Sequence, residues 1–194
     1  MSEFGDDRIR FYLENKDLID TWAALAAETR STFSQWLLDL ETDVAELAAE
    51  IGAASHLRDP DRWKIHMLAN QGWNEKLDDD STVVIAIEWN SSDVGVPAKL
   101  PYVGLRIAGG DDAAKARRQS FLDLCGDRLR NLDEYTVEQP RRWWSAWRYV
   151  APADDRWWEH ADDYRQLLLL SLEAAWQDLS PLVDEWIEAP SGRF

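Results

Sequence analysis

The sequence has very few of the residues that form disulfides and zinc centres. Its 194 residues include one cysteine, Cys125, and three histidines, His56, His66 and His160, scattered along the chain. A single cysteine forms no intramolecular disulfide, and a structural zinc site needs several Cys or His ligands at short spacings. These counts exclude a disulfide scaffold and a Cys/His zinc site, and we expect no bound metal.

Long hydrophobic runs are also missing. No apolar stretch approaches the roughly 20 residues that cross a bilayer as a helix. The N-terminal residues Met-Ser-Glu-Phe-Gly-Asp-Asp lack the basic and apolar regions of a signal peptide. We therefore expect a cytoplasmic protein that does not contact a membrane.

Motifs for catalysis and for nucleotide binding are absent from the sequence. It contains neither a Gly-x-Ser-x-Gly nucleophile elbow nor the glycine-rich patterns that hold the phosphates of nucleotides. Cys125 lies on the expected buried face of a helix, which is typical of an inert thiol. The sequence therefore favours a protein that is not an enzyme, and we expect no cofactor.

Positive charge is scarce and unevenly distributed. The chain has 21 Lys and Arg against 37 Asp and Glu, which gives a net charge of −16. Residues 1–52 contribute −8, residues 53–150 contribute −1, and residues 151–194 contribute −7. Nucleic-acid binding depends on neutralising phosphates with Lys and Arg, so this composition argues against direct nucleic-acid binding. The same charge attracts a basic protein partner.

Apolar and aromatic residues are abundant. They make up 45% of the chain and include twelve Trp, enough apolar surface to offset the entropy cost of folding. A chain of this length suits one domain that buries about 70% of its unfolded surface. We expect a single domain over residues 1–194, with helices in 1–52, a sheet in 53–150 that contains a helix at 111–132, and helices in 151–194.

The N-terminal segment repeats apolar residues at helical spacing. These residues are Phe11, Leu18, Trp22, Leu25, Phe33, Trp36, Leu40, Val44, Leu47 and Ile51. Asn15 and the cluster from Thr29 to Ser34 predict interruptions, and Gly52 is a natural C-terminal helix cap. We expect a short helix and then two longer ones. In the C-terminal segment, Asp154 and Asp155 predict a helix cap, and Ser180-Pro181 predicts the start of a last helix.

The central segment has the period and composition of strands. Strands are predicted at 63–68, 82–89, 102–108, 135–137 and 142–150. Their arrangement around the helix at 111–132 predicts an α+β fold: N-terminal helices, a mostly antiparallel sheet of about four to five strands with one inserted helix, and C-terminal helices. The buried face of the inserted helix is predicted to contain Ala114, Phe121, Leu122, Cys125 and Leu129.

Acidic residues concentrate on two of the predicted helical faces. They are Asp39, Glu41, Asp43, Glu46 and Glu50 before Gly52, and Asp154, Asp155, Glu159, Asp162 and Asp163 at the start of the C-terminal helix. If these helices pack together, their carboxylates form one negative surface that imitates the phosphates of a nucleic acid. The alternative interpretation is a set of ordinary solvated helix exteriors.

The most unusual segment alternates aromatic and basic residues between 141 and 149. In a regular strand, Trp143, Ser145, Trp147 and Tyr149 share one face, and Trp144 lies on the other. One interpretation is a stacking platform for bases or for a peptide. Its residues are Arg142, Trp143, Trp144, Trp147 and Arg148. The other is a core strand flanked by arginine, packed beneath the terminal helices.

The leading hypothesis is a non-enzymatic acidic protein that binds, and inhibits or neutralises, a basic partner such as a nucleic-acid-processing enzyme. One alternative is a divergent metal-dependent nuclease of the PD-(D/E)XK type that uses Asp61, Glu75 or Glu88, although neither Glu75-Lys76 nor Glu88 with Asn90 completes that motif. Another is a structural subunit, such as a homodimer, in which a second chain covers the Trp-rich strand.

Overall fold

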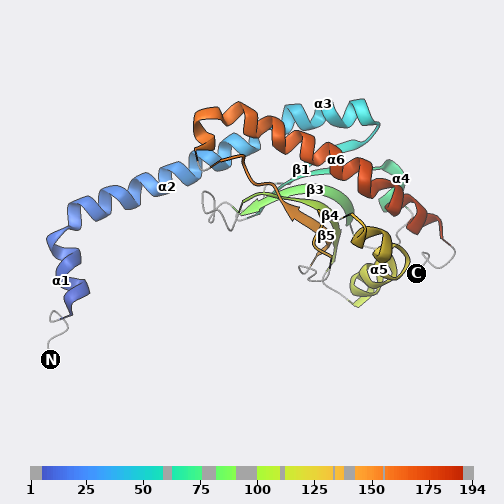
Figure 1. The fold of residues 1–194 in the computed structure, drawn as a ribbon, viewed down its shortest axis with the longest axis horizontal. Helices are drawn as coiled ribbons and strands as arrows, with labels where there is room; N and C mark the ends of the chain where they lie inside the picture. The colour runs from blue at the N-terminus through green and yellow to red at the C-terminus, as the bar shows by residue number, and fades with distance from the viewer. Residues whose placement is uncertain are drawn as a thin grey trace.

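The computed structural model describes residues 6–58, 63–75, 82–90, 100–109, 112–132, 134–137, 143–154 and 156–189. In the sequence, helices precede and follow an antiparallel sheet that has one long helix inserted before its last strand (Figure 1), which confirms the predicted α+β fold. The elements are α1 (Asp7–Glu14), α2 (Lys16–Leu38), α3 (Glu41–Ile51), β1 (Ala54–Arg58), β2 (Trp63–Ala69), α4 (Gln71–Glu75), β3 (Thr82–Asn90), β4 (Tyr102–Ala108), α5 (Asp112–Arg130), β5 (Trp144–Tyr149), η3 (Trp157–His160) and α6 (Ala161–Glu188).

The strands follow one another in the sheet in the order of the sequence, β1-β2-β3-β4-β5, and every neighbouring pair is antiparallel. The β-branched run of β3 is buried along nearly its whole length. The sequence pattern does not predict β1, because Ala-Ser-His-Leu-Arg has no β-branched residue and pairs only as an edge strand. The strand predicted at 135–137 is a single bridge between Thr136 and Trp147.

Helix α6 is the long helix that lies across the sheet (Figure 1). Its fully buried residues recur at helical spacing, at Leu168, Leu172, Leu179 and Val183 among others, and contact β3 and β4. The prediction of a separate helix from Ser180-Pro181 is wrong, because α6 runs through Pro181. Pro181 removes one backbone N–H from the helix, but the buried residues on either side hold the helix against the core.

Helix α1 and the first half of α2, residues 7–28, extend away from the sheet as an arm (Figure 1), whereas Phe33 and Leu37 in the second half of α2 are buried in the core. The predicted short helix and two longer ones are present, and Gly52 ends α3 with a φ of 73°, in the left-handed region that favours glycine. The interruption predicted at Thr29 to Ser34 is wrong. The Thr29 hydroxyl donates a hydrogen bond to the Leu25 carbonyl (2.9 Å), so it is satisfied inside a continuous α2.

Helix α5 packs against the sheet and α6 through the face that the sequence predicts. Ala114, Phe121, Cys125 and Leu129 are fully buried, and burial raises the pKa of the Cys125 thiol.

Within the described residues, no helix combines the length and the apolar character that a membrane-spanning segment requires.

A β-bulge shifts the pairing of β5 with β4. Gly104 faces Trp147, but Arg106 faces Trp144, so Ser145 is the extra residue on β5. The prediction that Trp144 lies on the opposite face from Trp147 is therefore wrong. The rings of Trp144 and Trp147 both lie beside Tyr102, at centroid distances of 4.9 and 6.0 Å.

Gly104 permits the close approach of β5 next to this bulge. A Cβ atom at this position would lie 2.0 Å from the carbonyl oxygen of Ala146 and 2.7 Å from the Cα of Trp147. Both atoms belong to backbone that is held in the sheet. We expect Gly104→Ala to lower the free energy of unfolding by about 1–3 kcal/mol or more, the usual cost of overpacking. Urea denaturation measures the loss, and wild-type stability in the variant would contradict this geometry.

His66 connects the sheet to the end of α2. Its Nε2 donates a hydrogen bond to the Leu37 carbonyl (2.8 Å), which lies in the last turn of α2 and also accepts a longer bond from the Leu40 N–H (3.3 Å). The side chain is almost fully buried, and this desolvation lowers its pKa despite the opposing effects of the hydrogen bond and of Glu41.

Acidification should therefore destabilise the fold through His66. Below a pH of about 6.5 the unfolded chain takes up a proton that the folded chain does not, so stability falls as pH decreases towards the lower pKa of the folded state. His66→Gln keeps an N–H donor and cannot titrate. We expect urea midpoints of this variant to fall less than those of the wild type between pH of about 7 and 5. Equal slopes would rule out His66 as the titrating group.

Candidate functional site

The predicted acidic faces are brought together on one side of the molecule. Helices α3 and α6 lie side by side above the sheet, as Figure 1 shows and their contacts indicate. Arg165 on α6 joins them, because its Nε lies 2.7 Å from Asp43 Oδ2 and its guanidinium donates to the Asp39 carbonyl at 2.9 Å. We call the combined region the acidic surface. Its described residues are Asp39, Glu41, Asp43, Glu46, Glu50, Asp154, Glu159, Asp162 and Asp163.

Local partners neutralise some of these carboxylates. Asp43 pairs with Arg165 and Glu159 pairs with Arg156, whereas Asp155 lies outside the described residues. The carboxylates of Glu41, Glu46, Glu50, Asp162 and Asp163 are exposed and, in the described part of the chain, belong to none of the ion pairs. Asp39 and Asp154 are also exposed and outside the ion pairs, but they accept hydrogen bonds from the Gln35 side chain and the Arg156 N–H, so the five are the exposed carboxylates of this surface without such a partner in the described part of the chain.

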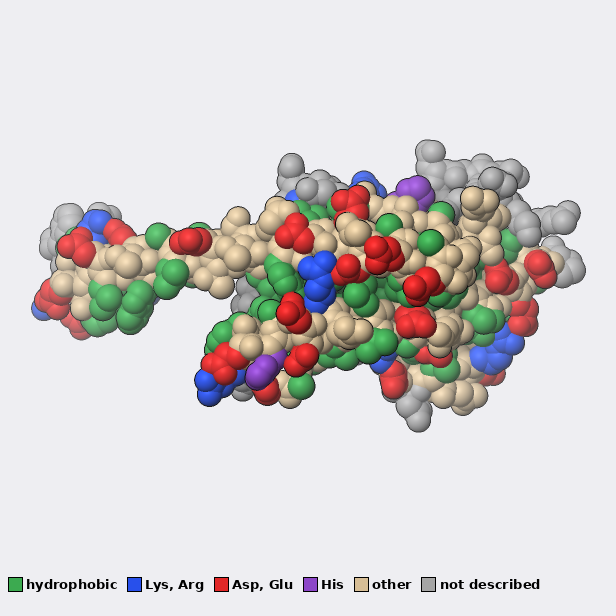
Figure 2. All heavy atoms as spheres, turned by 90° about the horizontal axis from the view of Figure 1, so that it is seen from above, with side chains coloured by type: hydrophobic (Ala, Val, Ile, Leu, Met, Phe, Trp, Pro, Cys, Tyr) green, Lys and Arg blue, Asp and Glu red, His purple; other side chains and the backbone are tan. Residues whose placement is uncertain are grey.

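Charge differs sharply between this side and helix α5. Helices α3 and α6 contain eleven Asp and Glu against one basic residue, Arg165. Helix α5 contains five Lys and Arg against three Asp. Figure 2, which looks down on the side of α3 and α6, shows acidic side chains over this face with few basic ones among them. Acidic residues therefore outnumber basic ones far more on α3 and α6 than on α5, although Asp184 and Glu185 of α6 face α4 and α5.

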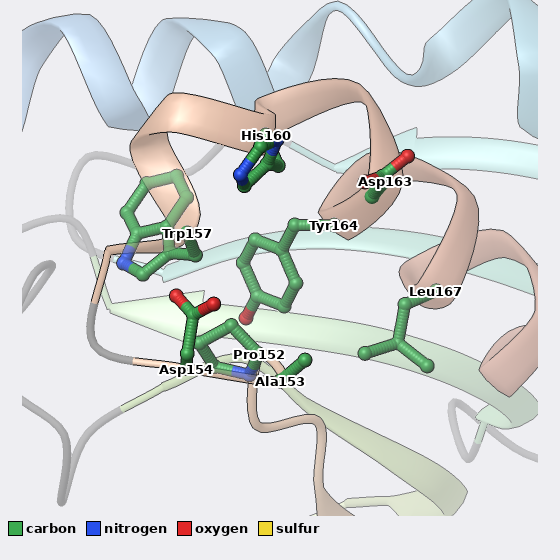
Figure 3. A pocket seen from close by; sticks show the side chains of 8 residues that line it. All are labelled: Pro152, Ala153, Asp154, Trp157, His160, Asp163, Tyr164 and Leu167. Atoms are coloured by element: carbon green, nitrogen blue, oxygen red, sulfur yellow. The ribbon is translucent and has the colours of Figure 1, made fainter.

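A small pocket adjoins the acidic surface where the chain turns from β5 into η3 and α6. It has a volume of about 110 Å³ and is lined by Pro152, Ala153, Asp154, Trp157, His160, Asp163, Tyr164 and Leu167 (Figure 3). The Tyr164 ring lies between Asp154 and His160, and Asp163 is set apart from both. The Tyr164 hydroxyl donates to the Val150 carbonyl (2.8 Å), and burial raises its pKa. This tyrosine anchors the turn, and the ionisable side chains do not converge.

The aromatic-basic segment forms part of the core and its border. Trp144 is 2% exposed, Trp143 and Trp147 are half-buried, and the Arg106 guanidinium lies 5.0 Å from the Trp143 ring. Arg148 pairs with Glu134 and lies over the Tyr135 ring. Arg142 lies outside the described residues. A flat stacking platform would need these rings to be open to solvent, so the packing fits the core-strand interpretation better.

Glu88, one of the candidate nuclease carboxylates, lies in a buried polar cluster. The side chains of Glu88 and Arg106 are 5% and 4% exposed, their Oε2 and Nε atoms are 3.6 Å apart, and the Tyr102 hydroxyl donates to Glu88. Burial lowers the pKa of Arg106, and Glu88 opposes that shift. Asp61 and the Glu75 side chain lie outside the described residues. Within the described residues, no group of three or more His, Cys, Asp or Glu is placed to hold a metal ion.

The structure also contains an apolar groove that sequence analysis missed. The groove has a volume of about 340 Å³ and lies between α2 on one side and η3 with the start of α6 on the other. Its lining residues are Leu25, Glu28, Thr29, Thr32, Phe33, Trp36, Trp157, Trp158 and Ala161. Helical spacing places Leu25, Phe33 and Trp36 on one face of α2, but the sequence carries no signal that Trp157 and Trp158 lie opposite them.

No protein-family model matches the chain, and neither a curated protein nor a solved structure matches it. Its function is therefore inferred from its own charge and geometry.

The buried Glu88 carboxylate is expected to be structural. Glu88→Ala leaves the Arg106 guanidinium buried without this partner, which should cost about 3–5 kcal/mol of unfolding free energy. Glu88→Gln keeps an acceptor for the Tyr102 hydroxyl and should cost less. Chemical denaturation of both variants tests this ranking. If Glu88→Ala is as stable as the wild type, Glu88 is not needed for folding and its burial requires another explanation.

Proposed function

We propose that this protein is a non-enzymatic interaction protein whose acidic surface binds a basic protein and inhibits or neutralises it. The observation that carries the proposal is the set of five exposed carboxylates, Glu41, Glu46, Glu50, Asp162 and Asp163, on two adjacent helices. Both helices pack on the same sheet and Arg165 bridges them, so the charges form a preorganised array.

The electrostatics favour a large basic partner over a single small cation. One exposed ion pair contributes only about 0–1 kcal/mol. Helices that pack together lie about 8–10 Å apart, close to the Debye length of about 8 Å at physiological salt, so their charges act together on an approaching protein. A broad negative surface therefore accelerates the encounter with a positive surface and selects against acidic partners.

Proteins that bind nucleic acids present such a positive surface. Their binding clefts are lined with Lys and Arg that neutralise phosphates. A rigid array of carboxylates occupies the same cleft without being a substrate for the enzyme. We therefore propose that the partner is a nucleic-acid-processing enzyme and that binding competes with its nucleic acid.

A matched pair of variants tests the acidic surface. The first variant combines Glu41→Gln, Glu46→Gln, Asp162→Asn and Asp163→Asn. The control combines Asp17→Asn, Asp112→Asn, Asp123→Asn and Glu188→Gln, which remove the same net charge at exposed positions elsewhere. Proteins captured on the immobilised wild-type chain are identified, and the affinity of the purified partner is measured by calorimetry. We expect a loss of about tenfold or more in the first variant only.

Salt dependence and competition complete this test. The affinity of the partner should fall steeply as salt rises, because added ions screen exposed charges. The captured enzyme should also lose activity when this protein is added, and excess nucleic acid should restore it. Binding that is insensitive to salt, or equal losses in both four-site variants, would contradict recognition by the acidic surface. Calorimetric binding of Mg²⁺ or Mn²⁺ would favour the nuclease alternative instead.

A further inference from the structure

The arm, residues 7–28, has large apolar side chains that the described chain does not cover. Phe11, Leu13, Leu18, Trp22 and Leu25 are 50–63% exposed. Soluble monomers rarely expose contiguous apolar patches of this kind, and large ones mark sites of association. Figure 2 shows apolar side chains gathered along one side of the arm.

The apolar stripe of the arm continues directly into the groove. Leu18, Trp22, Leu25, Thr29, Thr32 and Trp36 follow one another at alternating spacings of four and three residues along the single helix α2. This is the a/d spacing at which one helix packs along another. In the second half of α2, the rings of Trp157 and Tyr164 pack against Trp36 on this face. In the first half of α2, Leu18, Trp22 and Leu25 on the same face are exposed.

The exposed area is large enough for a stable interface. Large side chains bury about 150–250 Å² when aromatic and somewhat less when aliphatic, so the exposed part of Leu18, Trp22 and Leu25 in the stripe is on the order of 300 Å². The exposed apolar residues of α1, Ile9, Phe11, Tyr12 and Leu13, add about as much again. A standard protein interface buries about 800 Å² on each partner. The groove of the second molecule adds to this area.

The charge of this region suits a second copy of the same chain. Two molecules that each carry −16 repel one another over most of their surfaces. Residues 6–38 carry only −2 of that charge, and the six stripe residues carry none. Four basic residues offset four of the six carboxylates in this region, so the arm and groove form a part of the helical surface where two copies approach with little repulsion.

We propose that two copies exchange arms, so that the arm of each lies in the groove of the other. The arm precedes the groove on one straight helix, so reciprocal docking requires the two α2 helices to run antiparallel around a two-fold axis near residue 27. Trp22 of each copy then packs against the aromatic wall formed by Phe33, Trp36, Trp157 and Trp158 of the other. This interface uses none of the carboxylates of the acidic surface. The proposal of arm exchange therefore does not rest on the proposed function.

Two substitutions on opposite sides of α2 test the interface. Leu25→Glu places a charge in the stripe, and Ala27→Glu places the same charge on the opposite side of the same helix. Both positions are exposed, so we expect both variants to keep the wild-type fold. Circular dichroism and the thermal midpoint check this. Light scattering and sedimentation at about 1–100 µM should find a dimer for the wild type and for Ala27→Glu, but a monomer for Leu25→Glu. Trp22→Ala should raise the dimer dissociation constant at least about tenfold.

Cross-linking tests the antiparallel arrangement. A short bis-maleimide should join two copies of Leu25→Cys, which lie next to the two-fold axis. It should not join Leu18→Cys, because two residues 18 in an antiparallel pair are about 27 Å apart at 1.5 Å per residue. Cys125 is fully buried, so the wild type serves as the unreactive control.

Several outcomes would overturn this proposal. A monomeric wild type across the whole concentration range excludes arm exchange, and so does a dimer that survives Leu25→Glu. Cross-linking at both cysteine positions indicates parallel helices and rejects the reciprocal arrangement. The four-site variant of the acidic surface should still dimerise, so failure of the basic-partner proposal and failure of arm exchange are separate results.

Discussion

The burial of α6 against β3 and β4 is the interaction on which the rest of the structure depends. Each fully buried leucine or valine on this face contributes about 1.5–3 kcal/mol. The helix also makes hydrogen bonds to several other elements: Asp184 accepts from Trp73 of α4, Trp186 donates to Ser120 of α5, Tyr164 donates to the carbonyl that follows β5, and Arg165 reaches the start of α3. Misplacement of α6 would therefore disturb every layer of the fold.

The acidic surface follows from this packing. Because α6 uses its apolar face on the sheet, its outer face is polar, and the residues of its first turn that face solvent include Asp162 and Asp163. Acidic residues in a first turn also interact favourably with the helix dipole, as do Glu41 and Asp43 in α3. Part of this charge therefore has a structural reason. The dipole does not account for Glu46 and Glu50, which lie beyond the first turn of α3, so it leaves an excess of negative charge for a partner to recognise.

Sequence patterns predicted those helices, strands and buried faces that depend on residues close together in the chain. The helical period predicted three N-terminal helices, although α2 and α3 meet after Leu38 and not at the predicted break from Thr29 to Ser34. The β-branched run located β3, and the spacing of Phe121, Cys125 and Leu129 identified the buried face of α5. Predictions failed where tertiary packing decided the outcome. Pro181 remains helical because Leu179 and Val183 are buried, and the bulge at Ser145 becomes visible only in the pairing of β5 with β4. The side-by-side placement of α3 and α6 follows from the packing of both helices on the sheet, between residues far apart in the chain, so the sequence predicted the charges but not their relative positions.

The arm and the acidic surface use different residues, yet assembly through one would change the other. A pair of molecules joined by their arms presents two acidic surfaces on one particle. If the proposed partner has two basic sites, binding of the first would raise the effective concentration of the second acidic surface and increase avidity without any new contact. Such a pair would also concentrate negative charge, which would repel nucleic acid from the proposed enzyme partner. An exposed apolar arm is a liability for a lone molecule, since it invites non-specific association. Reciprocal docking removes that liability because it buries both arms at once.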